Sequence, residues 1–159
     1  MCEEFREQEV VEVVKEVLGR EGYRVVYEGR RGGPDVVACR DGEMLVIEVR
    51  GVPTLRKVKG KDKGRPKSVS TIKNQFRVWS AMVLWHLLAR EHQLVKESEE
   101  WVAIAKNGCR KYGVVRFVGV LGYHEGYVGI LEERALGLRR LGYEFWLLSK
   151  DGNVIKKFP

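Results

Sequence analysis

Two apolar segments on either side of Asp41-Gly42 constrain this 159-residue chain more than any other feature. Residues 35–39 (DVVAC) and 43–50 (EMLVIEVR) have the composition of strands, and Asp-Gly between them is a strong signal for a two-residue hairpin turn. With that turn, the numbers of any two facing residues sum to 83. Both faces of the paired strands are apolar, so the sequence predicts a hairpin in the interior of a sheet.

The same register places two carboxylates side by side at the open end of the hairpin. Asp35 faces Glu48, and directly facing residues have Cβ atoms about 4.5–5.5 Å apart. Opposed like charges in a semi-buried setting are destabilising, so a proton, an arginine or a divalent cation has to compensate them. Mg²⁺ suits a site of one or two carboxylates, a backbone carbonyl and waters. Arg50 lies about 7 Å beyond Glu48 on the same face, close enough to contact an anion held there.

The rest of the chain alternates between helical and strand patterns. An amphipathic helix is predicted over 3–20, a long apolar-rich helix over 70–92, and a short helix over 132–142. Further strands are predicted at 23–29, 101–107, 143–149 and 154–158, with a β-hairpin or two extended segments formed by 112–123 and 126–131. This order predicts one α/β domain over residues 1–159, with a mixed central sheet flanked by helices on both faces.

Cysteine and histidine spacing argues against the common soft-metal and redox sites. Cys2, Cys39 and Cys109 lie far apart without a C-x-x-C pair, which argues against a disulfide framework, a zinc ribbon or an iron–sulfur cluster. The three histidines also lack metal-ligand spacing. No apolar run reaches the ~18–20 residues of a membrane span and the N-terminus is too acidic for a signal peptide, so we expect a cytoplasmic protein with no membrane partner.

The net charge of +7 is concentrated in the loop formed by residues 52–70. Residues 56–67 contain seven basic residues and one acidic residue, a local charge of +6. A basic loop that follows the Glu48–Arg50 strand would emerge beside the carboxylates and bind phosphates without sequence preference. Its length suggests a functional or partly disordered segment. The candidate nucleic-acid contacts in it are Arg56, Lys57, Lys59, Lys61, Lys63, Arg65 and Lys67.

In order and spacing, the hairpin residues resemble the PD-(D/E)xK nuclease superfamily, which has the restriction-endonuclease-like fold. The motif residues are Pro34-Asp35 on one strand and Glu48-Val49-Arg50 on the adjacent strand. Residues 20–26 (REGYRVV) are similar to the segment by which archaeal Holliday-junction resolvases enter their first strand. The resemblance covers roughly residues 5–105, whereas the closing helix–strand unit, 130–159, matches only loosely.

This resemblance implies a metal site and contacts to a nucleic-acid strand. Mg²⁺, or Mn²⁺ in its place, would be bound by Asp35, Glu48 and the carbonyl of Val49. Helices that precede the first strand often donate a glutamate to such sites, and here Glu9 is preferred to Glu12.

The helix after the basic loop carries a second match to the superfamily. Gln75 and Trp79 are similar to the Q-x-x-x-Y motif of its exonuclease branch, whose glutamine and aromatic residue reach the site and the strand. Positions i and i+4 share one helical face. A core position is an equally good interpretation of Trp79.

Arg50 departs from the superfamily pattern, which has lysine at this position. Arginine stays protonated and cannot act as a base, but its planar fork suits a phosphate oxygen. A bound metal ion lowers the pKa of its water, so a separate base is dispensable; Lys73 is the nearby candidate if one is needed. The site residues that we expect to act in catalysis are therefore Asp35, Glu48, Arg50 and Gln75.

Three functions are compatible with these residues. The first is a metal-dependent DNA nuclease; the resemblance favours DNA over RNA. The second is a catalytically inactive nuclease-fold module that only binds DNA, because arginine replaces the motif lysine. The third is a structural or assembly protein in which Asp35, Glu48 and Arg50 form an ion-paired cluster. Many members of the superfamily are homodimers, but no interface signature is visible in the sequence.

Overall fold

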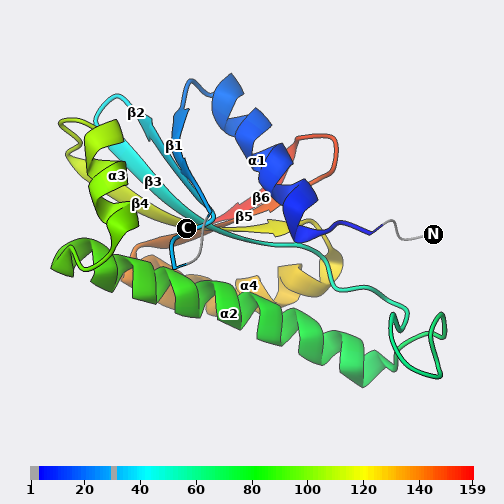
Figure 1. Ribbon diagram of the computed structural model, residues 1–159. Coiled ribbons are helices and arrows are strands. Elements are labelled where there is room, and N and C mark those ends of the chain that lie inside the picture. The colour runs from blue at the N-terminus through cyan, green and yellow to red at the C-terminus, as the bar shows by residue number, and fades with distance from the viewer. Residues whose placement is uncertain (1–3, 30–31) are drawn as a thin grey trace.

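The computed structural model describes residues 4–29 and 32–159, which form a mixed β-sheet with helices on both faces (Figure 1). In these residues no helix is long and apolar enough to cross a membrane. The elements, in chain order, are α1 (Glu7–Arg20), β1 (Arg24–Glu28), β2 (Val36–Arg40), β3 (Glu43–Arg50), α2 (Val69–Lys96), α3 (Glu100–Gly108), β4 (Val114–Gly122), α4 (Glu125–Leu141), β5 (Tyr143–Leu148) and β6 (Val154–Phe158).

The described strands form one sheet in the order β1-β2-β3-β4-β5-β6. β3 is parallel to β4 and β4 is parallel to β5, whereas the other neighbouring strands are antiparallel. The predicted mixed α/β sheet is confirmed. β3 therefore lies inside the sheet, with strands on both sides, as its two apolar faces require.

The hairpin register predicted from Asp41-Gly42 is also confirmed. Asp41 has φ 42° and Gly42 has φ 82°, the pair of positive angles that a type I′ turn needs. Val37 faces Val46, and every other recorded pair between β2 and β3 has numbers that sum to 83. The open end of this hairpin is consequently where the sequence placed it, with Asp35 directly before β2 and Glu48 near the end of β3.

Two hydrophobic cores lie on opposite faces of the sheet. One packs α1 against the alternate residues Leu45, Ile47 and Val49 of β3. The other contains Met44 and Val46 together with buried residues of α2, α3 and α4. Because strand side chains alternate between faces, Glu48 lies on the same face as Met44 and Val46, beneath α2.

Two segments predicted as extended are helical. Residues 101–107 lie in α3 and residues 126–131 lie in α4. Trp101 and Ala105 are buried four residues apart, and so are Tyr127 and Leu131 in α4. A short apolar run has the same composition in a buried strand and in a buried helix, so periodicity over six or seven residues did not separate them.

The basic segment is folded rather than disordered. Lys57 N donates to Arg65 O and Gly64 N donates to Lys57 O, both at 2.8 Å, so residues 55–67 form a hairpin-like loop. Asp62 lies 3.6 Å from the side chains of both Lys57 and Arg65. This basic loop stands at the N-terminal end of α2 (Figure 1).

A disulfide joins Cys39 in β2 to Cys109 directly after α3, with Cα atoms 5.4 Å apart. The expectation from cysteine spacing was therefore wrong for this pair. The two cysteines are 70 positions apart in sequence, and only the packing of α3 beside β1 and β2 brings them together. The bond lies near the turn of the β2–β3 hairpin, at the end of the sheet away from Asp35.

Candidate functional site

A small pocket of about 120 Å³ lies at the carboxyl end of β3, between the start of β2 and the middle of α2. It brings together Asp35, Glu48, Val49 and Arg50, as the sequence predicted. The other lining residues were not predicted as site residues: Glu7, Gly33, Met82, Val83, His86 and Arg90.

Asp35 is fixed by the backbone of β3. Its Oδ2 accepts a 2.7 Å hydrogen bond from Val49 N, and its own N–H donates to Ile47 O at 3.1 Å. The N–H and C=O of a strand residue point towards the same neighbouring strand. The carbonyl of Val49 therefore points to the β2 side as well, just beyond the first residue of β2, where the carboxylate of Asp35 lies.

Glu48 is a buried carboxylate with only 3% of its surface exposed. Its Oε1 accepts a 2.7 Å hydrogen bond from Arg90 Nε, and its carboxyl group is also in hydrogen-bonding contact with Asp35. Burial, and then the negative charge of Asp35, raise the pKa of Glu48 to about 8, and Arg90 offsets only part of this. If both carboxylates were ionised, their negative charge would exceed the charge of Arg90, so Glu48 holds a proton at neutral pH. A bound cation would take the place of that proton.

Arg90 was missed by the sequence-based prediction. Its Nη1 donates to Gly32 O at 3.0 Å and to Gln93 Oε1 at 3.1 Å, which holds the guanidinium against Glu48. Trp101 Nε1 donates to the same Gln93 oxygen at 2.9 Å. Helical spacing from Trp79 was the available signal, because residues 4, 7 and 11 positions later lie on the same face; Arg90 is the last of them.

Arg50 is the second cation of the pocket. Its guanidinium lies 5.0 Å from the ring centroid of Trp79, 3.8 Å from the carboxylate of Glu7, and 3.5 Å from Met82 Sδ. Its Nε is buried without a hydrogen-bond partner among the described residues. A buried donor without an acceptor is costly.

The helix-borne glutamate of the pocket is Glu7, not Glu9 or Glu12. Burial, followed by the charge of Asp35, raises the pKa of Glu7, while Arg50 lowers it. Glu9 instead accepts a hydrogen bond from Arg6 N at the start of α1, and Glu12 lies 3.2 Å from Lys15. Glu7 is the first residue of α1, but Glu9 is an acid of the same first turn, so this position alone does not separate the two.

Of the residues of α2 that were predicted to contact the nucleic-acid strand, one lies beside the pocket and the others lie outside it. Trp79 is half-buried: it packs against the hydrophobic core and also contacts Arg50, so its position fits both interpretations. Gln75 does not line the pocket: its Oε1 accepts from Lys67 Nζ at 3.1 Å. Lys67 also donates to Thr54 Oγ1 at 2.9 Å, and burial lowers its pKa. Lys73 is exposed on α2, outside the pocket.

The basic loop lies farther from the pocket than its place in the sequence suggested. α2 rises about 1.5 Å per residue, so its start at Val69 is about 20 Å from Met82 along the helix axis. Six predicted contacts in the loop are exposed: Arg56, Lys57, Lys59, Lys61, Lys63 and Arg65. The loop can contact the same extended ligand as the pocket, but not the same phosphate.

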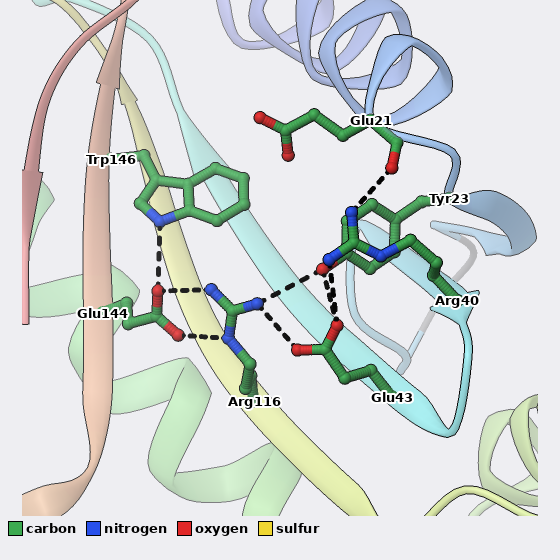
Figure 2. Close-up of polar contacts among 7 residues, drawn as sticks. All are labelled: Glu21, Tyr23, Arg40, Glu43, Arg116, Glu144 and Trp146. Carbon is green, nitrogen blue, oxygen red and sulfur yellow. Dashed lines mark hydrogen bonds and ion pairs between the residues drawn. The ribbon is translucent and has the colours of Figure 1, made fainter.

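A second charged cluster lies at the other end of β3, on the α1 face (Figure 2). Arg116 donates to both oxygens of Glu144 at 2.7 Å and to Glu43 at 2.9 Å. Tyr23 hydroxyl donates to Glu43 at 2.9 Å, and Arg40 also contacts Glu43. These donors and acceptors satisfy one another across four strands, β2 to β5, so we assign the cluster a structural role and call it the Arg116 network.

The pocket residues meet part of the requirement for a divalent cation. Among residues 4–29 and 32–159, no three His, Cys, Asp or Glu side chains are grouped as metal ligands. Asp35, Glu48 and the Val49 carbonyl nevertheless supply hard oxygen donors of the kind that Mg²⁺ prefers, with surplus negative charge. Arg90 occupies one of those oxygens, so metal binding at Glu48 would compete with it.

No protein-family model, curated protein or solved structure matches this chain. The superfamily resemblance therefore remains a prediction that rests on the motif residues. The chemistry of the pocket carries the functional interpretation.

Proposed function

We propose that the protein is a metal-dependent phosphodiesterase that hydrolyses nucleic acid, with DNA as the favoured substrate. The observation that carries the proposal is the buried pair of Asp35 and Glu48 at the end of β3, with Arg50 beside it. Retaining such a pair costs stability, and a carboxyl group in a pocket whose pKa is strongly perturbed by burial and a specific charged neighbour is a candidate for a functional site. The mixed sheet, with this acid-x-Arg segment on an interior strand, is compatible with a restriction-endonuclease-like fold.

Mg²⁺, or Mn²⁺ in its place, would be held by Asp35, Glu48 and the Val49 carbonyl. A bound divalent ion supplies an activated water at neutral pH and neutralises charge on the phosphate. Glu7 adds a further carboxylate to the same pocket, in the role that the sequence analysis gave to Glu9. The position of Val49 follows from its hydrogen bond to Asp35, so the carbonyl and the carboxylate are set together.

Arg50 would bind the phosphate that is being cleaved. It cannot accept a proton at physiological pH, so its contribution is to hold and neutralise phosphate oxygens. Its long pair with Glu7, at 3.8 Å, supports this assignment, since it leaves the guanidinium able to bind a phosphate oxygen. Trp79 packs against the guanidinium and limits its orientation.

A nucleic-acid-binding module without hydrolysis is the second candidate. Two observations favour it: Arg90 already occupies an oxygen of Glu48 at 2.7 Å, and Arg50 cannot serve as a base. In that case the pocket would bind phosphate through its arginines, and divalent ions would have no effect on binding.

The deciding experiment is cleavage of supercoiled, linear, single-stranded and branched DNA with Mg²⁺ or Mn²⁺, comparing wild type, Glu48→Gln and Glu144→Gln. Glu144 is the matched control because it is also paired with an arginine, but in the Arg116 network. The nuclease assignment requires cleavage that is lost in Glu48→Gln and kept in Glu144→Gln. Binding that persists without cleavage, even in Arg50→Lys, would identify the binding module. A wild type that neither cuts nor binds would leave the carboxylates with a structural role.

A further inference from the structure

Trp85, in the middle of α2, is 74% exposed. Two other tryptophans of the chain, Trp101 and Trp146, are 2% and 1% exposed. An indole is among the largest apolar groups that a protein can bury, so an exposed one forgoes that stabilisation, and it marks an interaction site where it belongs to a larger exposed apolar surface. The neighbours of Trp85 on α2 form such a surface.

Trp85 is surrounded by small or flexible apolar side chains. The residues one turn away in each direction are alanines, Ala81 and Ala89, and both are exposed. The positions three residues away are Met82 and Leu88, each 37% exposed. Because neighbours at i±3 and i±4 define the surface around a helical residue, the indole has no bulky or charged side chain of its own helix over its faces. We call these five residues the α2 platform.

The platform borders the candidate site. Met82 belongs to both the platform and the pocket, since it lines the pocket and its Sδ accepts a hydrogen bond from Arg50 Nη2 at 3.5 Å. Trp85 follows Met82 by three residues, so their Cβ atoms are about 5–6 Å apart. A planar group attached to a phosphate at Arg50 can therefore reach the indole across Met82.

The charge around the platform suits a polyanion. Glu91 is the one acidic residue in the sequence of α2, and it accepts a 3.0 Å hydrogen bond from Tyr143. Lys73 and Arg77 are exposed on the same helix, towards the basic loop with its charge of +6. An apolar surface on a helix whose charge balance is positive favours a ligand with flat apolar groups on a negative backbone over a neutral protein face.

We propose that Trp85 stacks on an unpaired base next to the phosphate bound at Arg50, so that the protein recognises single-stranded or locally unpaired nucleic acid. The identity of the polyanion rests on the proposed function. Base–aromatic stacking tolerates every base but needs an open base face. In a duplex those faces are covered by neighbouring base pairs, so the platform discriminates against fully paired substrates.

The test is binding, measured in EDTA so that cleavage does not enter. A labelled oligothymidylate of about 16 nucleotides, near the upper end of single-strand site sizes, is compared with a duplex of the same length. Trp85→Ala should weaken single-strand binding about 5- to 150-fold and leave duplex binding within about twofold. Trp85→Phe should restore part of the loss. Val95→Ala is the matched control, because Val95 is 75% exposed at the far end of the same helix.

Unchanged single-strand affinity in Trp85→Ala would overturn the proposal. So would a dimeric wild type that Trp85→Ala converts to monomer in sedimentation without a change in affinity, because the platform would then be an interface between two copies. Cleavage by wild type and Glu48→Gln, assayed separately, reports on the proposed function alone. A protein that binds single strands through Trp85 but never cuts would retain this inference and lose the nuclease assignment.

Discussion

The two ends of β3 carry similar charged groups, but these groups are fully hydrogen-bonded and ion-paired at one end and incompletely at the other. In the Arg116 network, both nitrogen edges of one guanidinium are occupied by Glu43 and Glu144 (Figure 2). In the pocket, Arg50 keeps a buried donor without a partner among residues 4–29 and 32–159, and Glu48 faces another carboxylate. The same kinds of side chain are therefore fully paired at one end of the strand and incompletely paired at the other.

The pKa shifts of the two glutamates express this difference. Burial acts to raise the pKa of Glu43, but hydrogen bonds from Arg116 and Tyr23 hold it below its ordinary value. Burial and Asp35 raise the pKa of Glu48 to about 8 although Arg90 donates to it. An ion-paired carboxylate is thus unremarkable by itself. What distinguishes a candidate site is a carboxylate whose partners fail to neutralise it.

Removing the disulfide should have the largest effect on the free energy of unfolding, because the bond reinforces the end of β3 that carries the Arg116 network. Replacing Cys39 and Cys109 with serine opens a loop of 70 residues and should lower the free energy of unfolding by about 4 kcal/mol. Urea unfolding of the oxidised wild type and the double variant measures this. Metal-dependent stabilisation should be unchanged, since the bond lies away from the pocket. Equal stability of the two proteins would show that the bond does not restrict the unfolded chain.

Arg116→Ala should cause the second-largest loss in the free energy of unfolding. It leaves Glu43 and Glu144 partly buried and without their shared cation, at a cost of about 3 kcal/mol in urea unfolding. Arg134→Ala is the control, because its pair with Glu133 is on the surface and such pairs contribute about 0–1 kcal/mol. If both variants lose equally little, the network is no more than a surface ion pair and the contrast with the pocket disappears.

The dependence of stability on pH should have opposite signs at the two ends. The raised pKa of Glu48 gives a contribution that is complete below the ordinary value of 4.5 and is lost as the pH rises through about 8. The contribution of Glu43 is present above its ordinary pKa and is lost in acid. Thermal melts should show that Glu48→Gln removes a loss of stability of a few kcal/mol that builds up between about pH 4.5 and pH 8, whereas Glu43→Gln removes a loss in acid. An unchanged slope between pH 4.5 and pH 8 in Glu48→Gln would contradict the assignment.

Arg90→Gln should have the smallest effect and should sharpen the comparison most. Without Arg90 Nε on its Oε1, Glu48 is free to bind a cation, so the rise in Tm with Mg²⁺ should exceed that of wild type. A tenfold gain in metal affinity corresponds to about 1.4 kcal/mol at saturating metal. Arg24→Gln, which removes an exposed hydrogen bond to Gly108 O, is the control. A smaller Mg²⁺ response in Arg90→Gln would mean that Arg90 positions Glu48 and does not compete for it.

Local signals predicted the part of the site that depends on one hairpin. Asp41-Gly42 determines a register, and the register alone brings Asp35 beside Glu48, with Arg50 on the same face. The mixed sheet followed from the alternation of strand and helix patterns. These features were predictable because each depends on residues close together in the sequence.

The remaining parts of the site depend on how distant segments pack. Glu7 rather than Glu9 reaches the pocket because the chain before α1 packs against the residues that follow β3, where Val52 N donates to Phe5 O. Arg90 reaches Glu48 from 42 residues away, through a helix whose apolar residues occur on all sides. The disulfide has the same origin. An acid in the first turn does not separate Glu7 from Glu9, helical spacing places Arg90 only on one face of α2, and the disulfide has no local signal. The short apolar runs in α3 and α4 were ambiguous for a related reason.

The separation between the basic loop and the pocket also determines how long a bound strand must be. A strand held at both places spans about 20 Å along α2, or roughly six nucleotides at 3.4 Å each. Longer strands would gain the affinity of the loop and its strong dependence on salt. Fragments shorter than this would keep only the contacts at the pocket and would dissociate soon after they form. In a nuclease built this way, the folded basic loop would retain long substrates, and products too short to reach the loop would dissociate.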